Sequence, residues 1–225
     1  MYTPNNLLIS AMPRSARMRF VAVSELVHMS TDFVLWKPDE QSTLAFFPVS
    51  GYISIEAVTK GVPALEVGMI GREGMAGLHL FLGATSSSLG ACVRMEGSAY
   101  VCNATELRLL MLECLPFRVS MGHYIALTLA QLSASVACGR FHSTRQRLAK
   151  WLLMAADRVG GGVLHATQST IASLLGVRRV GVTIAATEMQ DAGYIRYARG
   201  EIEVLNRHGL EGCACSCYSR ESGWK

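Results

Sequence analysis

Three cysteines alternate with other residues near the C-terminus, at Cys213, Cys215 and Cys217. On an extended strand, side chains two residues apart point to the same face, so the three thiols would share one side. Such a cluster suits a soft metal ion or redox chemistry. Structural zinc sites more often use a Cys-x2-Cys spacing with a second ligand pair, and no such second pair is visible. We therefore predict no metal site here and keep a metal or redox role as the alternative.

The histidines form no recognisable metal-binding pair. They are scattered along the chain, at His28, His79, His123, His142, His165 and His208. Neither a His-x-His nor a His-x3-His spacing occurs, so a metal-dependent enzyme on a cupin-like barrel has little support. His79 lies in an apolar context and is interpreted as a core histidine, with an axial haem ligand as the alternative. The sequence also lacks a nucleophile elbow and a phosphate-binding loop, so we predict that the chain is not an enzyme.

Arginines stand at the start of a predicted helix over residues 178–192. Arg178 and Arg179 lie in its first turn, where a guanidinium can donate two hydrogen bonds to a guanine in the major groove of DNA. Thr183 and Thr187 are one turn apart on its exposed side and are candidates to contact a base or a phosphate. Further candidates for phosphate contacts are Thr167, Gln168, Ser169, Arg196 and Arg199. The pattern favours binding to double-stranded DNA, in which the C-terminal thiols are expected to be silent.

The elements that position these arginines follow the helix-turn-helix plan. Thr167 can cap a helix over residues 168–175, and Gly176 permits the left-handed backbone of a tight turn. After the second helix, apolar and polar residues alternate on both sides of Arg199-Gly200, as they do in a β-hairpin. A hairpin at this place is a wing. The alternative interpretation is a small α/β domain with an exposed basic helix.

The N-terminal half is predicted to be rich in β-structure. Residues 7–27 mix apolar and basic residues at helical spacing, which predicts one or two short helices. Short runs of β-forming residues punctuated by Pro and Gly then indicate a sandwich or barrel. These strands are expected near residues 33–36, 44–47, 52–58, 64–67, 92–96 and 99–102. The fold class is therefore α+β.

A long apolar helix is expected between the β-rich part and the basic part. A helix over residues 105–114 precedes it, and Pro116 punctuates the two. Apolar residues at spacings of three and four then form a stripe close to the coiled-coil period, namely Met121, Ile125, Leu129, Leu132 and Val136. The position of this stripe favours dimerisation, with packing on its own domain as the alternative. A further helix over residues 143–158 ends at the glycines of 160–162, a stop signal and hinge.

Charge and composition agree with this division. Half of the 225 residues are hydrophobic and 17% are charged, which argues against disorder. Residues 140–225 carry 12 Lys and Arg against 7 Asp and Glu, a basic excess where a polyanion would bind. The odd number of cysteines, seven, and an N-terminus unlike a secretion signal favour reduced thiols in a cytoplasm. Residues 119–139 are long enough for a membrane span, but their polar residues favour a helix packed against protein.

Four stretches resemble the Crp/Fnr family, the cyclic-AMP-receptor and fumarate-nitrate-reduction regulators of transcription. They cover residues 46–51, 67–77, 145–152 and 167–200. The resemblance implies an N-terminal double-stranded β-helix of the cyclic-nucleotide-binding type, a long dimerisation helix and a winged helix-turn-helix. It also implies a homodimer on a two-fold operator, with RNA polymerase as a further partner.

The sequence departs from the family pattern in three places. Members that bind cyclic AMP hold it with a Gly-Glu-Leu stretch and an Arg-Ser pair, whereas residues 74–77 and 85–88 here lack the carboxylate and the guanidinium. The first cysteine is Cys92, so the N-terminal cluster of the iron–sulfur members is missing. Of the three base-reading positions of the family, Arg179 matches one, but Val180 and Ile184 occupy the others. We therefore expect neither cyclic AMP nor an iron–sulfur cluster, and the effector is unknown.

The expected organisation is a sensor domain over residues 1–114, a dimerisation helix over 115–140, a winged helix-turn-helix over 141–212 and a C-terminal tail over 213–225. The predicted function is that of a cytoplasmic, non-membrane, homodimeric regulator of transcription. Two alternatives stay open. One is a constitutive regulator without an effector, and the other is a ligand-binding or enzymatic cupin-like barrel whose C-terminal domain does not bind DNA.

Overall fold

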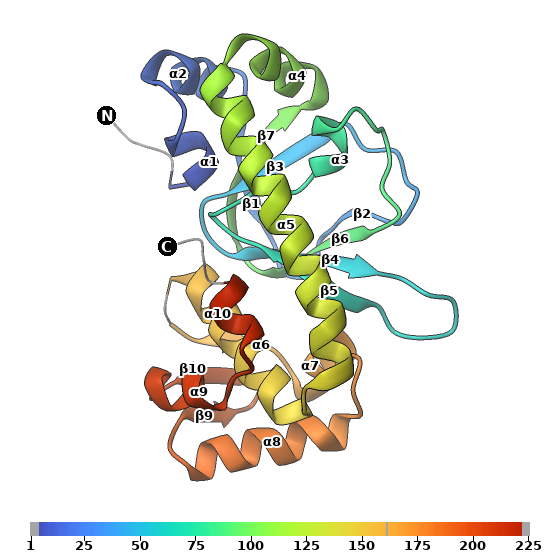
Figure 1. The fold of residues 1–225 in the computed structure, drawn as a ribbon, viewed down its shortest axis with the longest axis vertical. Helices are drawn as coiled ribbons and strands as arrows, with labels where there is room; N and C mark the ends of the chain where they lie inside the picture. Colours follow the sequence, from blue (N-terminus) through green and yellow to red (C-terminus); the bar gives the residue numbers. More distant parts are fainter. Residues whose placement is uncertain (1–4, 161, 222–225) are drawn as a thin grey trace. The chain divides into compact units, whose positions relative to one another are not determined.

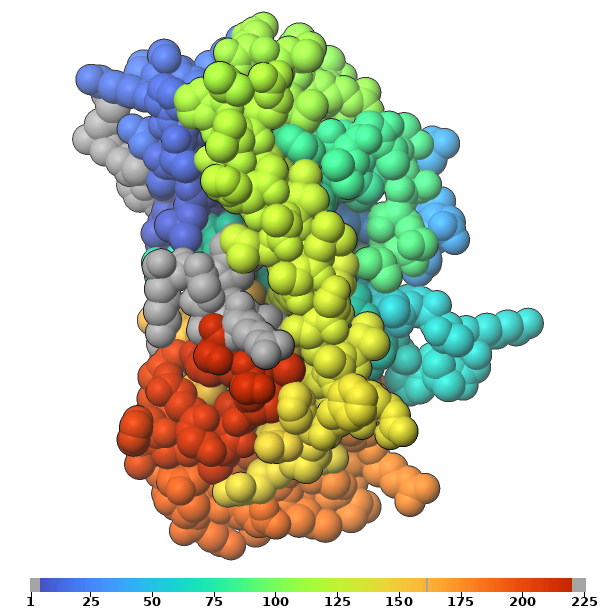
Figure 2. Space-filling model, viewed as in Figure 1, coloured from blue at the N-terminus to red at the C-terminus, as the bar shows by residue number. Residues whose placement is uncertain are grey.

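The computed structural model describes residues 5–160 and 162–221. They form two compact units, drawn as a ribbon in Figure 1 and in space-filling form in Figure 2. The first unit contains the residues up to Ile55 together with Ile70–Leu129, and the second contains Glu56–Met69 together with the residues from Ala130 on. Three parts of the expected organisation lie outside the described residues. They are Gly161 of the hinge, residues 1–4 of the sensor domain and residues 222–225 of the C-terminal tail.

Seven strands in the N-terminal half form two sheets. The first sheet has the order β1-β7-β3, with β1 and β3 antiparallel to β7, and the second has the order β2-β6-β4-β5. The strands are β1 (Glu25–Met29), β2 (Val34–Trp36), β3 (Leu44–Pro48), β4 (Tyr52–Ala57), β5 (Leu65–Ile70), β6 (Gly90–Met95) and β7 (Gly97–Asn103). All of them except β1 lie where runs of β-forming residues predicted a strand.

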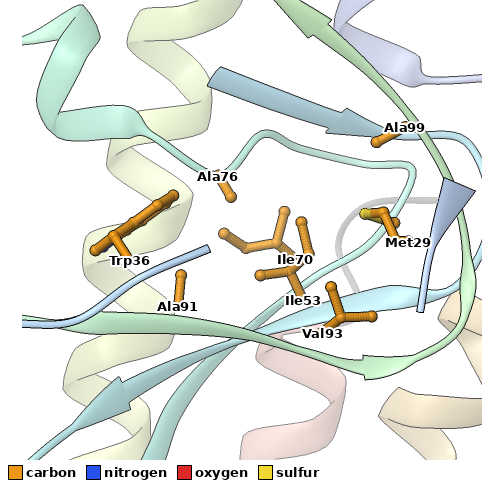
Figure 3. Close-up of a cluster of buried hydrophobic side chains, with 8 residues drawn as sticks. All are labelled: Met29, Trp36, Ile53, Ile70, Ala76, Ala91, Val93 and Ala99. Carbon is orange, nitrogen blue, oxygen red and sulfur yellow. The ribbon is translucent and has the colours of Figure 1, made fainter. Parts of the chain in front are cut away.

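An apolar core of the first unit draws side chains from both sheets (Figure 3). Met29 and Ala99 come from the first sheet, and Ile53 and Val93 are among those from the second. The full cluster consists of Met29, Trp36, Ile53, Ile70, Ala76, Ala91, Val93 and Ala99. Because side chains alternate along a strand, Ala91 and Val93 of β6 point to the same side, into this core. The α+β fold class is thus confirmed.

Five helices accompany the sheets along the chain. They are α1 (Leu7–Ser10), α2 (Arg14–Ala22), α3 (Leu78–Phe81), α4 (Ala104–Glu113) and the long α5 (Leu115–Phe141). Asn6 caps α1 and is fully buried. Its side-chain amide donates to the carbonyls of Pro48 and Gly74 at 2.9 and 2.8 Å, so its polar atoms have partners. Asn103 caps α4 through a hydrogen bond from the Glu106 amide.

The second unit is organised around α6 (Thr144–Val159). A reciprocal pair of hydrogen bonds between Ser143 and Gln146 forms a capping box at its start, and Gly160 ends it in the left-handed conformation with a φ of 80°. The elements after α6 are β8 (Leu164–His165), α7 (Gln168–Leu175), α8 (Arg179–Asp191), β9 (Ile195–Ala198), β10 (Glu201–Val204), α9 (Arg207–Cys213) and α10 (Cys217–Glu221). The strands form one sheet in the order β8-β10-β9.

Two expectations from the sequence are wrong in detail. Glu25–Val27 belong to strand β1, not to a helix, because their backbone pairs with β7 in the register Glu25↔Val101. Residues 213–217 do not form an extended strand, since Cys213 ends α9 and Cys217 begins α10. Pro116 lies in the first turn of α5, as it does in the helix expected over residues 115–140, and a proline there leaves no hydrogen bond unmade.

His79 packs as a partly buried histidine of the first unit. Its Nε2 atom lies 2.8 Å from the Ser42 hydroxyl, and its ring meets the Trp36 ring edge-on. Burial lowers the pKa of His79, which favours the neutral imidazole. These contacts agree with its interpretation as a core residue.

In the part of the chain that the structure describes, no single helix has the length and apolarity needed to cross a membrane. The pair α7 and α8 reaches the threshold together, but the two helices are bent by 113°.

Candidate nucleic-acid interface

Helices α7 and α8 form the predicted helix-turn-helix. The Thr167 hydroxyl caps α7 by accepting a hydrogen bond from the Thr170 amide at 3.1 Å. Gly176 ends α7 with a φ of 61°, a left-handed conformation that glycine adopts at little cost. The two helices face each other through buried apolar residues, and these are Ile171, Leu174, Leu175, Val182, Ala185, Ala186 and Met189. This packing leaves the opposite face of α8 to solvent.

The solvent face of α8 carries the residues predicted to read DNA. Arg178 is the N-cap of the helix, and Arg179 is its first residue, and both side chains are exposed. Val180 and Ile184 are 68% and 55% exposed, although apolar residues of this size are usually buried. Thr183 is also exposed. An arginine and two aliphatic side chains on one open face suit contacts with base edges and thymine methyl groups.

Hydrogen bonds tie this face to the start of α7. The Thr183 hydroxyl lies 2.6 Å from Oε1 of Gln168, to which it donates, and 3.2 Å from the Arg179 carbonyl. The Thr187 hydroxyl donates to the Thr183 carbonyl at 3.0 Å. Each threonine therefore has its proton engaged within the protein and offers its lone pairs outward.

The wing is a hairpin of β9 and β10 with a two-residue turn. Arg199 and Gly200 both have positive φ, 53° and 84°, as a type I′ turn requires. Arg196 is paired with Glu203 directly opposite on β10 in an exposed ion pair, so its predicted phosphate contact would compete with that carboxylate. Arg199 lies at the tip and is exposed.

Tyr197 fastens the wing to the rest of the domain. Its hydroxyl donates to the Ala166 carbonyl at 2.7 Å, and its amide donates to Oε1 of Gln190 at 3.0 Å. Burial raises the pKa of Tyr197 to about 12, against the opposing effect of the nearby Arg179 charge. The phenol therefore stays a neutral hydrogen-bond donor at physiological pH.

A polar hollow lies between the start of α7, the exposed side of α8 and the wing. Six of the predicted DNA-contacting residues line it, namely Thr167, Gln168, Ser169, Arg179, Thr187 and Arg199. Gln190 and Tyr197 also line the hollow and were not predicted, because their sequence context resembles that of ordinary helix and strand residues. Arg178, Val180, Thr183, Ile184 and Arg196 lie outside its lining.

The residues predicted for dimerisation do not share one exposed face of α5. Met121 is fully buried within its own unit, and Ile125 and Leu132 are partly buried. Leu129 and Val136 are 60% and 76% exposed. The exposed residues of α5 at alternating spacings of three and four are instead Val119, Gly122, Ala126, Leu129, Ser133 and Val136, which we call the α5 row.

Comparison with known proteins agrees with this geometry. Residues 146–213 match the family model of the Crp-like helix-turn-helix domain. This part of the chain is a Crp-like helix-turn-helix domain. The match begins in α6 and ends with α9, so the Crp-like domain includes the helix-turn-helix and the wing. No curated protein matches the sequence.

Solved structures extend the likeness over nearly the whole chain. FixK2 from Bradyrhizobium japonicum has a TM-score of 0.72 at 16% identity, over 86% of this chain and 98% of its own. A putative regulator of the crp/fnr family from Eubacterium rectale has a TM-score of 0.69 at 17% identity, over 92% and 97%. The c-di-GMP responsive regulator CLP from Xanthomonas campestris has a TM-score of 0.68 at 16% identity, over 86% of this chain and 99% of its own. The resemblance to the Crp/Fnr regulators is thereby confirmed at the level of the fold.

Proposed function

We propose that this chain is a transcription regulator that binds double-stranded DNA through α8 of its Crp-like domain. The observation that carries the proposal is the open face of α8, with Arg179 at its first turn and the hollow between α7 and the wing beside it. In the helix-turn-helix geometry, the start of the second helix enters the major groove. Arg178 and Arg179 would then donate to guanines, and Val180 and Ile184 would contact base edges.

The remaining predicted residues would hold the DNA backbone. Thr167, Gln168 and Ser169 stand at the N-terminal end of α7, where amide groups and the helix dipole favour a phosphate. Arg199 presents its guanidinium from the wing tip. These contacts fix the position of the domain on the duplex and carry no sequence information.

We further propose that the active form is a homodimer joined along the α5 row. Exposed apolar and small residues at alternating spacings of three and four are typical of a two-helix seam. Leu129 and Val136 of the predicted set lie in this row, whereas Met121 is buried within its own chain. Two α8 helices would then enter successive major grooves about 34 Å apart on a two-fold operator. RNA polymerase is the further partner that we propose.

We also propose that the regulator does not respond to cyclic AMP. Ala76, at the place of the family's phosphate-binding stretch, is buried in the apolar core, and its backbone pairs with Phe46. Residues 85–88 supply hydroxyl groups but no guanidinium. A cyclic phosphate placed there would lack charged partners.

The salt dependence of binding to random duplex DNA tests the proposed function. Phosphate neutralisation gives a steep decrease of affinity with salt, and each lost contact lowers the slope by about 1. We expect Arg199→Ala to lower the slope. Arg108→Ala removes an equal charge from an exposed side chain on α4 of the first unit and should leave the slope unchanged. Binding that does not depend on salt, or an equal effect of both variants, would contradict the proposal.

A further inference from the structure

Four side chains with soft donor atoms converge at the C-terminal end of α5, within the second unit. They are Cys138, His142, Cys215 and Cys217, and their ligand atoms all lie within 4.8 Å of one another. The Sγ atoms of Cys138 and Cys215 are 3.5 Å apart, and Sγ of Cys217 is 3.8 Å from Nδ1 of His142. In Figure 2 the red C-terminal residues lie beside the yellow end of α5.

Local structure brings each pair of residues to one side. Cys138 and His142 are four residues apart, and the His142 amide still donates to the Cys138 carbonyl at 3.2 Å, so one helical turn stacks their side chains. Cys215 and Cys217 flank the turn that opens α10, in which the Tyr218 amide donates to the Cys215 carbonyl at 3.0 Å. The two pairs are 73 residues apart in sequence and meet only in the folded unit.

Two of the distances between the four side chains match those around a single tetrahedral ion. Zinc binds thiolate sulfur at about 2.3 Å and imidazole nitrogen at about 2.0–2.1 Å. Tetrahedral angles then place two sulfur ligands about 3.8 Å apart and a sulfur and a nitrogen about 3.6 Å apart. Two separations in the group, 3.5 and 3.8 Å, are close to these values, and every other pair of ligand atoms lies within 4.8 Å. An iron–sulfur cluster of two irons would instead separate its ligands into two distant pairs.

The surroundings are those of a closed site. All three thiols are buried, and His142 is partly exposed. Lys150 is also buried and lines the same cavity as Cys138, and a positive charge there suits a centre whose three thiolates exceed the charge of a divalent ion. Cys213 stands apart from the group, because its sulfur accepts a hydrogen bond from Arg145 at 3.1 Å.

We propose that Cys138, His142, Cys215 and Cys217 bind one zinc ion. A Cys3His set of four protein ligands is a structural zinc site, and soft thiolates select zinc over hard cations. The ion would link the end of α5 to the turn before α10. Its ligand His142 directly precedes Ser143, the residue that caps α6. It would therefore stiffen the junction from which the Crp-like domain starts.

Titration of the purified protein with cobalt and zinc tests this site. The protein is reduced, stripped with a chelator and titrated anaerobically with Co²⁺, whose visible absorption reports tetrahedral thiolate coordination, and Zn²⁺ is then added to displace it. We expect one ion per chain. His142→Ala and Cys217→Ser each remove a side chain that binds the ion directly, so the affinity for the ion should fall by more than the roughly 10–100-fold typical of changing a residue that only supports a ligand.

Cys213→Ser is the matched control, because Cys213 is an equally buried cysteine two residues from the cluster. We expect it to bind Co²⁺ and Zn²⁺ as the wild type does, and circular dichroism identifies any variant that fails to fold. His142→Ala changes a partly exposed side chain and keeps the test valid if a cysteine variant unfolds. A folded, fully reduced wild type that binds no ion overturns the proposal, and so does an equal loss in Cys213→Ser. The zinc proposal is also overturned if the thiols form a disulfide on oxidation but the reduced protein binds no ion.

Discussion

Arg179→Ala removes the guanidinium at the first residue of the proposed recognition helix. One bidentate pair between arginine and guanine contributes about 1–3 kcal/mol of discrimination against the wrong base. The homodimer presents this pair twice, once in each half-site, so the variant loses about 2–6 kcal/mol of discrimination. This corresponds to roughly a 30-fold to 10⁴-fold loss in the ratio of specific to non-specific affinity.

Fluorescence anisotropy at a fixed salt concentration measures this ratio, with a selected operator and the same duplex with shuffled half-sites. Because the Arg179 side chain is exposed, its removal should change the free energy of unfolding by less than about 0.5 kcal/mol. Arg199→Ala is the comparison, since a lost phosphate contact weakens binding to both duplexes by the same factor. If Arg179→Ala also weakened both equally, the assignment of α8 as the base-reading helix would be refuted.

Three further variants test the dimer, the first unit and the turn of the helix-turn-helix. Leu129→Asp places a charge in the α5 row and should give monomers in light scattering, whereas Leu112→Asp on α4, where the side chain is 73% exposed, should leave the dimer intact; dimers in both would contradict the seam. Burial lowers the pKa of His79 below its usual 6.5, so the folded state resists protonation and the free energy of unfolding should fall as the pH drops below about 6.5. Urea unfolding at about pH 7.5 and about pH 5.5 checks this, because His79→Gln should reduce the difference and an unchanged difference would assign it to other groups. Gly176→Ala should cost about the 1–2 kcal/mol of a left-handed alanine, because the one atom close to its Cβ, Cδ1 of Leu65 at 2.8 Å, ends an exposed side chain that can move away. Gly193→Ala has a φ of 72° and no atom within 4 Å, so its free energy of unfolding should fall by the same amount, and a much larger loss at Gly176 would contradict this reasoning.

Local signals explain why the Crp-like domain was predictable. The cap at Thr167, the left-handed Gly176 and the alternation around Arg199-Gly200 each act within a few residues, and each forms as expected. Strand β1 has no such signal, because Glu25–Met29 become a strand only by pairing with β7, whose partner residues lie 68 to 76 positions later. Its short sequence is compatible with a helix until that partner is present.

The stripe predicted for dimerisation contains residues from two sides of α5. A helix between two apolar environments carries apolar residues on more than one side, and periodicity does not say which side packs inside its own chain. Met121 lies on the inner side, and Leu129 lies on the outer side. Only the exposure of each side chain in the folded unit distinguishes the inner residues from the outer ones.

The cysteine cluster was missed because its ligands come from distant segments. Neither the spacing between cysteines nor the spacing between histidines indicates the cluster, because Cys138 and His142 form a mixed pair four residues apart on one helical face. That spacing was the available signal. The approach of Cys138 and His142 to Cys215 and Cys217 depends on the packing of α10 and could not be deduced from spacing.

Selection of bound sequences from random duplex DNA, without an added ligand, is the decisive experiment on whether α8 reads DNA as part of a dimer. We expect the wild type to recover a two-fold motif with half-sites about 10 base pairs apart, centre to centre. The double variant Arg178→Ala/Arg179→Ala should lose this motif but keep salt-dependent binding to any duplex. Recovery of the same motif by the double variant, or a wild type that enriches no motif and binds without dependence on salt, would show that α8 is not the base-reading helix.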